Sequence, residues 1–197
     1  MKTFKISSDQ KQIIMGKLLG DGHLETANGK TWRLKIEHSL SQKVYVDWLY
    51  DKLKNLAASE PRIKQQAVQG KVYSKYWFNT CYSGSFRFYS QKFYDHGRKI
   101  APRQIKRWLT PLALAVWYMD DGSRKSHQHR AKIINTQSFD RFSLNLLQSA
   151  LKLNFGIETK LRKQREGWQI YIFGREAEKF AKVIGKYVLP NFSYKLD

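Results

Sequence analysis

The chain has 197 residues, of which 42% are apolar and 14% aromatic, so it can bury a core and is too apolar for a disordered protein. Its 36 lysines and arginines outnumber 16 aspartates and glutamates, giving a formal net charge of +20, and its single cysteine excludes an internal disulfide. This charge favours a nucleic-acid partner, while the lack of a long basic amphipathic helix, a lipidation signal or a membrane-spanning apolar run disfavours a membrane partner.

The first half of the chain predicts alternating helices and strands. Polar residues 7–9 offer N-caps for an apolar run that stops at Asp21-Gly22. Apolar and charged residues alternate between Trp32 and His38, as in a strand with one buried face. In the next helix, Val44 is among the apolar residues at helical spacing. The predicted elements are a helix at residues 9–19, a strand at 32–38, a helix at 41–56, strands at 62–69 and 72–82, a strand and turn around 86–89, and a short helix near 91–96.

The second half repeats this order. Thr110 followed by Pro111 is a strong helix start, because Thr caps well and Pro is favoured in the first turn. In the strand that follows, Lys132-Ile133 echoes Lys35-Ile36 of the first half. The predicted elements are a helix at residues 112–119, a strand at 131–136, a helix at 139–154, strands at 157–164 and 168–173, and a helix at 177–188.

The repetition predicts an α+β fold of two pseudo-symmetric αββαββα-like repeats. We place the first repeat at residues 1–104 and the second at residues 105–197, within one compact pseudo-twofold monomer. The repeats are expected to pack through their first helices, with antiparallel sheets forming a saddle for DNA.

Both of these first helices end in Asp-Gly, within IMGKLLGDG (residues 14–22) and LAVWYMDDG (residues 114–122). One Asp-Gly alone is an ordinary helix stop. Two copies at equivalent places predict instead that Asp21 and Asp121 lie side by side, with Gly16 and Gly20 allowing the helices to approach closely. Two facing carboxylates at the negative ends of helices are disfavoured unless cations lie between them, and oxygen ligands favour Mg²⁺.

The two segments resemble the paired signature of the LAGLIDADG homing endonucleases. The second half extends the resemblance, because LTPLALAVWYMDDG, IINTQSF and VLPNFSYKLD are similar in wording and order to monomeric, two-repeat, intron-encoded members. The resemblance implies a site-specific double-strand DNA endonuclease that hydrolyses phosphodiesters at a long pseudo-palindromic site and leaves short 3′ overhangs.

The resemblance also implies the metal ligands. The last acidic residue of each motif binds metal in this family, which corresponds to Asp21 and Asp121 here. The main-chain carbonyls of the preceding Gly20 and Asp120 are further candidate ligands. Two or more divalent ions are expected, Mg²⁺ first, with Mn²⁺ able to substitute.

A basic residue near each scissile phosphate is a further property of the family. The matching positions are Lys99, in RKIAP, and Lys195, in SYKLD. Each would position the attacking water or stabilise charge in the transition state, and a plain phosphate contact is the alternative for either one.

Polar residues on the outward faces of the strands predict the DNA contacts. A two-stranded ribbon fits the major groove, where Arg and Lys suit guanine and Gln suits adenine, although contacts to phosphate are equally open for each residue. The candidates are Arg33, Lys35, Arg62, Lys64, Gln66, Lys75, Arg130, Lys132, Lys160, Arg162, Gln164, Gln169 and Tyr171.

Three other functions remain open at the level of sequence. An RNA-splicing maturase on the same scaffold would use the basic surface on intron RNA without needing the carboxylates. A cleavage-inactive DNA-binding protein would typically have lost one acidic residue, and this chain has both. A basic ribosome-associated protein would leave the paired motifs unexplained. The sequence is compatible with location in an organelle or in a bacterial cytoplasm, and it does not distinguish between the two.

Overall fold

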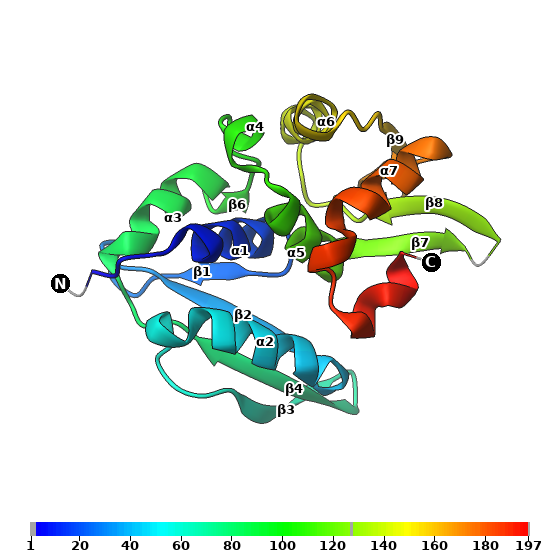
Figure 1. Cartoon of the computed structure of the whole chain (residues 1–197). Coiled ribbons are helices and arrows are strands. Elements are labelled where there is room, and N and C mark those ends of the chain that lie inside the picture. The colour runs from blue at the N-terminus through cyan, green and yellow to red at the C-terminus, as the bar shows by residue number, and fades with distance from the viewer. Residues whose placement is uncertain (1–2, 127, 197) are drawn as a thin grey trace. The chain divides into compact units, whose positions relative to one another are not determined.

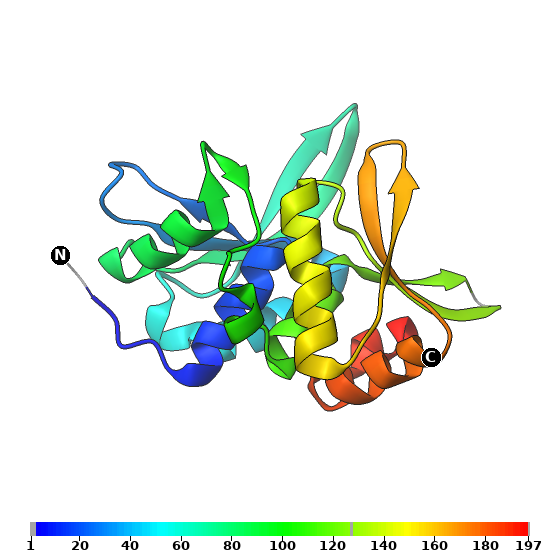
Figure 2. The ribbon, with the colours of Figure 1, turned by 90° about the horizontal axis from the view of Figure 1, so that it is seen from above.

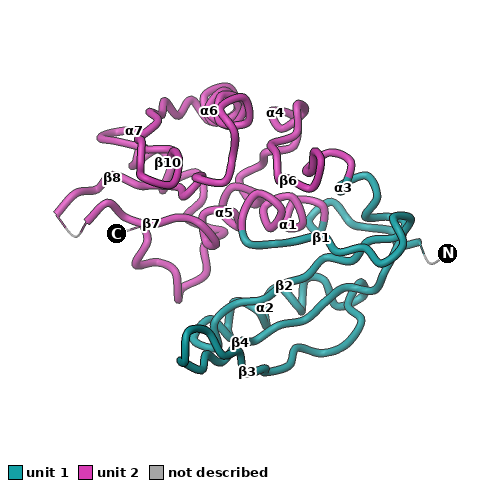
Figure 3. Tube along the Cα trace, turned by 180° about the vertical axis from the view of Figure 1, so that it is seen from behind, with its two compact units in different colours: residues 1–10, 21–90 teal, residues 11–20, 91–197 magenta. Residues whose placement is uncertain are grey.

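The computed structural model describes residues 3–126 and 128–196 (Figure 1). The chain divides into two compact units, which are described separately (Figure 3). The N-terminal unit consists of residues 1–10 and 21–90, and the C-terminal unit of residues 11–20 and 91–197. These units follow spatial contacts, and the boundary between sequence repeats after residue 104 stays a prediction.

The N-terminal unit is built on a four-stranded antiparallel sheet in the order β1-β2-β4-β3. Its inner face buries Leu34 and Ile36 of β2, together with Phe78 of β4 and Leu49 of α2. Gln69 and Gly70 both have positive φ in the turn between β3 and β4. The elements are β1 (His23–Glu25), β2 (Arg33–Ser39), η1 (Leu40–Gln42), α2 (Lys43–Leu53), η2 (Lys54–Leu56), β3 (Arg62–Val68), β4 (Lys71–Asn79) and η3 (Gly84–Phe86).

The C-terminal unit contains a second antiparallel sheet in the equivalent order β7-β8-β10-β9, with the β9–β10 hairpin drawn in yellow and orange in Figure 2. The helices α1 (Ser8–Leu19) and α3 (Arg87–Phe93) each have residues in both units. The remaining elements are β5 (Tyr94–Asp95), β6 (Arg98–Lys99), α4 (Ile105–Trp108), α5 (Pro111–Asp121), β7 (Gly122–Ser126), β8 (His129–Ile134), α6 (Arg141–Phe155), β9 (Lys160–Gln164), β10 (Gly167–Ile172), α7 (Arg175–Ile184), η4 (Gly185–Tyr187) and η5 (Pro190–Lys195).

The order of elements confirms the predicted repeat. The series α1-β1-β2-α2-β3-β4-α3 recurs as α5-β7-β8-α6-β9-β10-α7, and the two sheets share one strand order. The α+β class and the αββαββα pattern are therefore both confirmed.

Local side-chain chemistry explains where the motif helices begin. The main-chain N–H of Gln10 donates to Ser7 Oγ, and Gln10 Oε1 accepts from the N–H of Ser7, so Ser7 caps α1 through a reciprocal capping box. Thr110 accepts from the N–H of Ala113, and Pro111 occupies the first turn of α5. Both helix starts follow the sequence prediction.

Three local predictions were wrong. Residues 86–89 belong to η3 and α3 rather than to a strand, since Ser83 caps a helical turn there. Val44 is 62% exposed, because the buried face of α2 runs through Tyr45, Leu49 and Leu53. The chain after each Asp-Gly forms a strand, β1 or β7, where no strand was predicted.

No helix among residues 3–126 and 128–196 combines the length and the apolar character that crossing a membrane requires.

Candidate functional site

The α1 segment of the C-terminal unit packs against α5 at very short range. A Cβ atom on Gly16 would lie 2.5 Å from the carbonyl oxygen of Ala113 and 2.6 Å from Cβ of Val116. A Cβ on Gly20 would overlap the side chain of Asp120. The predicted close approach of the two motif helices at Gly16 and Gly20 is thus confirmed, and only glycine fits at either place.

A buried ion pair joins the same two helices. Lys17 Nζ lies 2.8 Å from both carboxylate oxygens of Asp120, and neither side chain is exposed to solvent. Sequence analysis did not single out Lys17, although a lysine within the apolar run IMGKLLGDG was a usable signal. The pair explains why Asp120 is tolerated opposite Gly20, because the lysine compensates its buried charge.

Both predicted catalytic lysines bind main-chain carbonyls at the C-terminal ends of the motif helices. Lys99 Nζ donates to the carbonyl of Gly20 at 2.6 Å, and Lys195 Nζ donates to the carbonyl of Met119 at 2.7 Å. Cations are favoured at these helix ends, where unpaired carbonyls carry partial negative charge. The Gly20 carbonyl, a predicted metal ligand, is therefore in contact with Lys99.

Lys195 is held in place by further contacts. It is 7% exposed, its Nζ lies 5.1 Å from the ring centroid of Phe192, and its own carbonyl accepts a hydrogen bond from the Tyr118 hydroxyl. Burial raises the pKa of Tyr118, so its phenol stays a neutral donor. These contacts hold Lys195, in η5, against α5.

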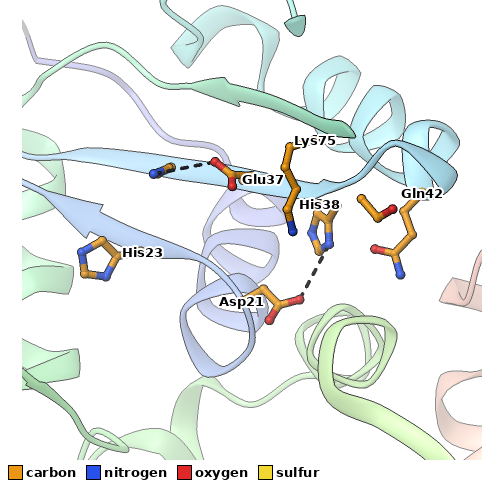
Figure 4. A pocket seen from close by; sticks show the side chains of 8 residues that line it. Asp21, His23, Glu37, His38, Gln42 and Lys75 are labelled. Carbon is orange, nitrogen blue, oxygen red and sulfur yellow. Dashed lines mark ion pairs between the residues drawn. The ribbon is translucent and has the colours of Figure 1, made fainter. Parts of the chain in front are cut away.

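Asp21 lies in the N-terminal unit with 49% of its side chain exposed. His38 of β2 faces it, with 3.7 Å between His38 Nδ1 and Asp21 Oδ2 (Figure 4). His38 itself is buried and packs against the ring of Tyr45. The two residues open onto a cavity of about 520 Å³, which is lined by Asp21, His23, Lys35, Glu37, His38, Ser39, Gln42 and Lys75.

His38 had no role in the sequence prediction. The available signal was its place in the strand alternation, because Leu34, Ile36 and His38 share the buried face of β2. A histidine at the third of these positions is typical of a polar group at the edge of a core, which by itself does not indicate a site.

Asp121 ends α5 in the C-terminal unit. Its carbonyl accepts hydrogen bonds from the main-chain N–H and the side-chain amide of Asn135. A cavity of about 470 Å³ begins directly after it and is lined by Gly122, Ser123, Arg124, Ser126, Tyr194 and Lys195. Because Asp21 and Asp121 belong to different units, their predicted adjacency stays a prediction.

The predicted DNA contacts of the N-terminal unit share one face of its sheet. Cross-strand pairing places Lys35 beside His23, Glu37 beside Trp77, and Lys64 beside Lys75. Because residues two apart on a strand point the same way, this pairing collects the six candidates on one side. They are Arg33, Lys35, Arg62, Lys64, Gln66 and Lys75.

In the C-terminal unit, five candidates likewise share one face, because Gln169 pairs with Arg162, and Tyr171 with Lys160. These five are Lys160, Arg162, Gln164, Gln169 and Tyr171. The predicted outward position of Lys132 is wrong, since it is 2% exposed and donates to the carbonyl of Leu196 at 2.6 Å.

Strand register explains the error at Lys132. It pairs with Ile172, and Ile134 pairs with Ile170, so Lys132 lies on the core-facing side of β8. Arg130, two residues earlier, is on that side too, and its guanidinium reaches Glu178 of α7 at 3.0 Å. In the similar pairs Lys132-Ile133 and Lys35-Ile36, the core-facing residue is Lys132 in the first and Ile36 in the second. Aligning the two pairs was therefore an error of one residue, which assigned the side chains of β8 to the wrong faces of the sheet.

Comparison with known proteins gives consistent results. A model of the LAGLIDADG DNA endonuclease family matches residues 11–180. DNA endonuclease I-ChuI of Chlamydomonas applanata is 31% identical, and the alignment covers 98% of this chain and 96% of that protein. Cytochrome b mRNA maturase bI2 of Saccharomyces cerevisiae is 29% identical, over 93% of this chain and 46% of the maturase.

Among solved structures, the homing endonuclease I-WcaI bound to its DNA recognition sequence has the same fold. It superimposes with a TM-score of 0.92 at 22% identity, over 100% of this chain and 88% of that chain. The family match extends over most of the sequence and includes the first motif helix from residue 11 and the whole of the second. The chain belongs to the LAGLIDADG DNA endonuclease family.

Proposed function

We propose that this protein is a monomeric, site-specific homing endonuclease that cleaves both strands of double-stranded DNA in a divalent-metal-dependent reaction. Its family membership supports this function, and the strongest structural support is an arrangement of charged groups at the ends of the motif helices. Each motif helix leads into an aspartate, and a lysine amino group binds a main-chain carbonyl one residue before Asp21 or two residues before Asp121. Packing alone does not require this combination of acidic and basic groups twice.

Asp21 and Asp121 would hold the metal ions. The half-exposed carboxylate of Asp21 opens onto a cavity, so a hydrated cation can reach it. Carboxylate and carbonyl oxygens are the ligands that Mg²⁺ prefers, and Mn²⁺ accepts the same set. When bound, such ions activate a water molecule and stabilise the leaving oxygen in phosphodiester hydrolysis. The carbonyls of Gly20 and Asp120 are the additional ligands that we propose.

Lys99 and Lys195 would act beside these ions. Each ammonium group is held by a main-chain carbonyl at 2.6 or 2.7 Å, so its position at the end of a motif helix is fixed. A fixed cation is suited to stabilising the negative charge that develops on the phosphorus centre.

The sheet faces would bind the duplex. Arg, Lys and Gln on paired strands suit the major groove, and two similar but unequal sheets suit a long, roughly pseudo-palindromic site. Short 3′ overhangs are the expected product.

Cleavage of a randomised duplex library tests this function. With Mg²⁺ or Mn²⁺, we expect one family of related sequences to be cut on both strands, and with EDTA no cutting. Asp21→Asn and Asp121→Asn should each abolish double-strand cleavage while leaving affinity for the selected site within about threefold, because only the metal ligand is lost. Full-rate cleavage by either variant would disprove its assigned role.

A maturase activity is the second candidate, and the similarity to maturase bI2 favours it. This activity would need the basic surface but not the carboxylates. Protection of a structured intron RNA by the wild-type protein and equally by Asp21→Asn would support it, and binding of that RNA no tighter than of an unstructured RNA would argue against it.

A further inference from the structure

The two sheets differ in their acidic residues. Strands β7 to β10, as the structure describes them, contain no Asp or Glu, whereas Glu25 and Glu37 are present in β1 and β2. Both glutamates lie on the face that carries the predicted DNA contacts, because Glu25 pairs with Arg33 and Glu37 is two residues from Lys35 on the same strand. An acidic residue on a surface that faces phosphates opposes binding, so these two require an explanation.

Glu37 is held between two lysines. Its Oε2 atom is buried and lies 2.6 Å from Lys64 Nζ and 3.7 Å from Lys35 Nζ. Lys64 in turn lies over the ring of Trp77, 5.8 Å from the centroid. About 20% of the Glu37 side chain remains exposed although Oε2 is buried between the two lysines, so part of the side chain is open to solvent.

Glu25 continues the same network. Its Oε2 accepts from Arg33 Nε at 2.9 Å, and its Oε1 lies 3.6 Å from Lys35 Nζ. Burial alone would raise the pKa of Glu25, but the hydrogen bond and charge of Arg33, with the nearby Lys35, outweigh burial and lower it below its ordinary value. The row Arg33, Glu25, Lys35, Glu37, Lys64 therefore alternates in charge across three strands.

Stability does not account for this row. The ion pairs of this row are partly exposed to solvent, and such pairs contribute little to folding. In a chain with a net charge of +20, a lysine in place of glutamate would strengthen non-specific binding. A carboxylate in the major groove can instead accept a hydrogen bond from the amino group of cytosine, and it repels the acceptor atoms of guanine. When this carboxylate lies between two cations, its repulsion from the DNA phosphates is smaller and its direction is fixed.

We propose that Glu37 is a specificity-determining residue: fixed by Lys35 and Lys64, it reads a cytosine at one position of the target and weakens binding to other sequences. The inference rests on the proposed function, because it requires this face to contact duplex DNA. The proposal also gives the two sheets different roles. The N-terminal sheet provides sequence discrimination, and the C-terminal sheet, whose described strands contain no Asp or Glu, provides affinity.

The test compares wild-type protein with Glu37→Gln in two measurements. The first is affinity for a random-sequence 30-base-pair duplex at several salt concentrations. Because the substitution releases lysines for phosphate, we expect about threefold to tenfold tighter binding and a slope of log K against log salt that steepens by about one. The second is selection of bound sequences from a randomised duplex library, in which one position should lose its preference for cytosine and shift toward adenine, since Gln pairs with adenine.

Glu158→Gln is the matched control. It removes the same charge and one lysine contact, between Lys152 and Glu158 at 2.7 Å, but Glu158 lies between α6 and β9 and outside the sheets. The proposal is overturned if Glu37→Gln behaves like this control in both measurements. It is also overturned if Glu37→Gln binds more tightly while its selected sequences match those of the wild type.

A second variant covers the case in which Glu37→Gln does not fold. Glu37→Asp keeps the charge and shortens the side chain by one methylene, so it should keep the wild-type salt slope while its cytosine preference weakens. An unchanged preference would overturn the proposal. If the wild-type protein itself enriched no sequence, the proposed function would fail instead, which separates the two results.

Discussion

At the scale of the residue, the lysines at the helix ends are the groups whose chemistry can be separated from binding. Lys99→Met should slow cleavage about 100-fold or more with little change in affinity, because it would remove the charge that we propose to act beside the reacting phosphate. Single-turnover cleavage and equilibrium binding on the selected site measure the two effects. Lys152→Met, which changes an exposed lysine on α6, should alter neither, and a Lys99 variant that only bound more weakly would make Lys99 a phosphate contact.

Some of these residues could be predicted from sequence and others could not. Asp21 and Asp121 are selected as candidates from the paired motifs, whereas Lys99 and Lys195 are selected from the family resemblance, and the roles of all four stay predictions. Lys17 could not be paired with Asp120 from sequence, since that contact depends on how α1 and α5 pack.

At the scale of the element, the contact between α1 and α5 limits what can replace Gly16. Gly16→Ala should lower the free energy of unfolding by about 1–3 kcal/mol, because the added methyl meets the Ala113 carbonyl and Val116. Denaturant unfolding measures this change. In the control Gly185→Ala, the new methyl has no heavy atom within 4 Å and φ is −52°, so stability should change by no more than about 0.5 kcal/mol. Equal effects of the two substitutions would contradict the packing account.

The buried ion pair gives a second prediction for the same helices. Lys17→Met should lower the free energy of unfolding by about 3–5 kcal/mol, because the buried carboxylate of Asp120 would lose the lysine charge that compensates it. The double variant Lys17→Met, Asp120→Leu should recover most of that loss. Thermal and denaturant unfolding test both variants, and a double variant less stable than Lys17→Met would show that burial of the charge is not the cause.

Helix ends and strand register differ in how well they can be predicted. Ser7, Thr110 and Pro111 act through bonds or backbone angles within a few residues, so the starts of α1 and α5 are readable from sequence. The register of β8 depends on pairing with β10, and an error of one residue placed Lys132 on the wrong face. The set of residues proposed to contact DNA from the C-terminal sheet is accordingly smaller than predicted.

At the scale of the whole molecule, the net charge of +20 predicts strong salt dependence. If six to ten phosphates are neutralised, affinity for duplex DNA should fall by about 10³ to 10⁵ between 50 and 200 mM salt. Fluorescence anisotropy with a labelled duplex measures this. A loss of less than about tenfold would indicate that most of the basic residues do not contact phosphate.

The repeat could be read from the sequence as an order of elements, but the compact units could not. Sequence similarity groups α1 with the strands that follow it, whereas contacts group residues 11–20 with α5 and the C-terminal sheet. The packing of α1 at Gly16 and Gly20, which the motif did predict, is part of this grouping, but the motif alone does not show which compact unit α1 joins.

This grouping of α1 has a consequence for recombination between relatives. A chimera of two relatives joined after residue 104 would combine α5 of one protein with α1 of the other. Val116 and Asp120 of this chain would then lose their contacts with its α1 residues. Exchanges that transfer residues 11–20 together with the C-terminal part keep that contact intact. When parts of family members are exchanged, α1 and α5 should therefore be taken from the same protein.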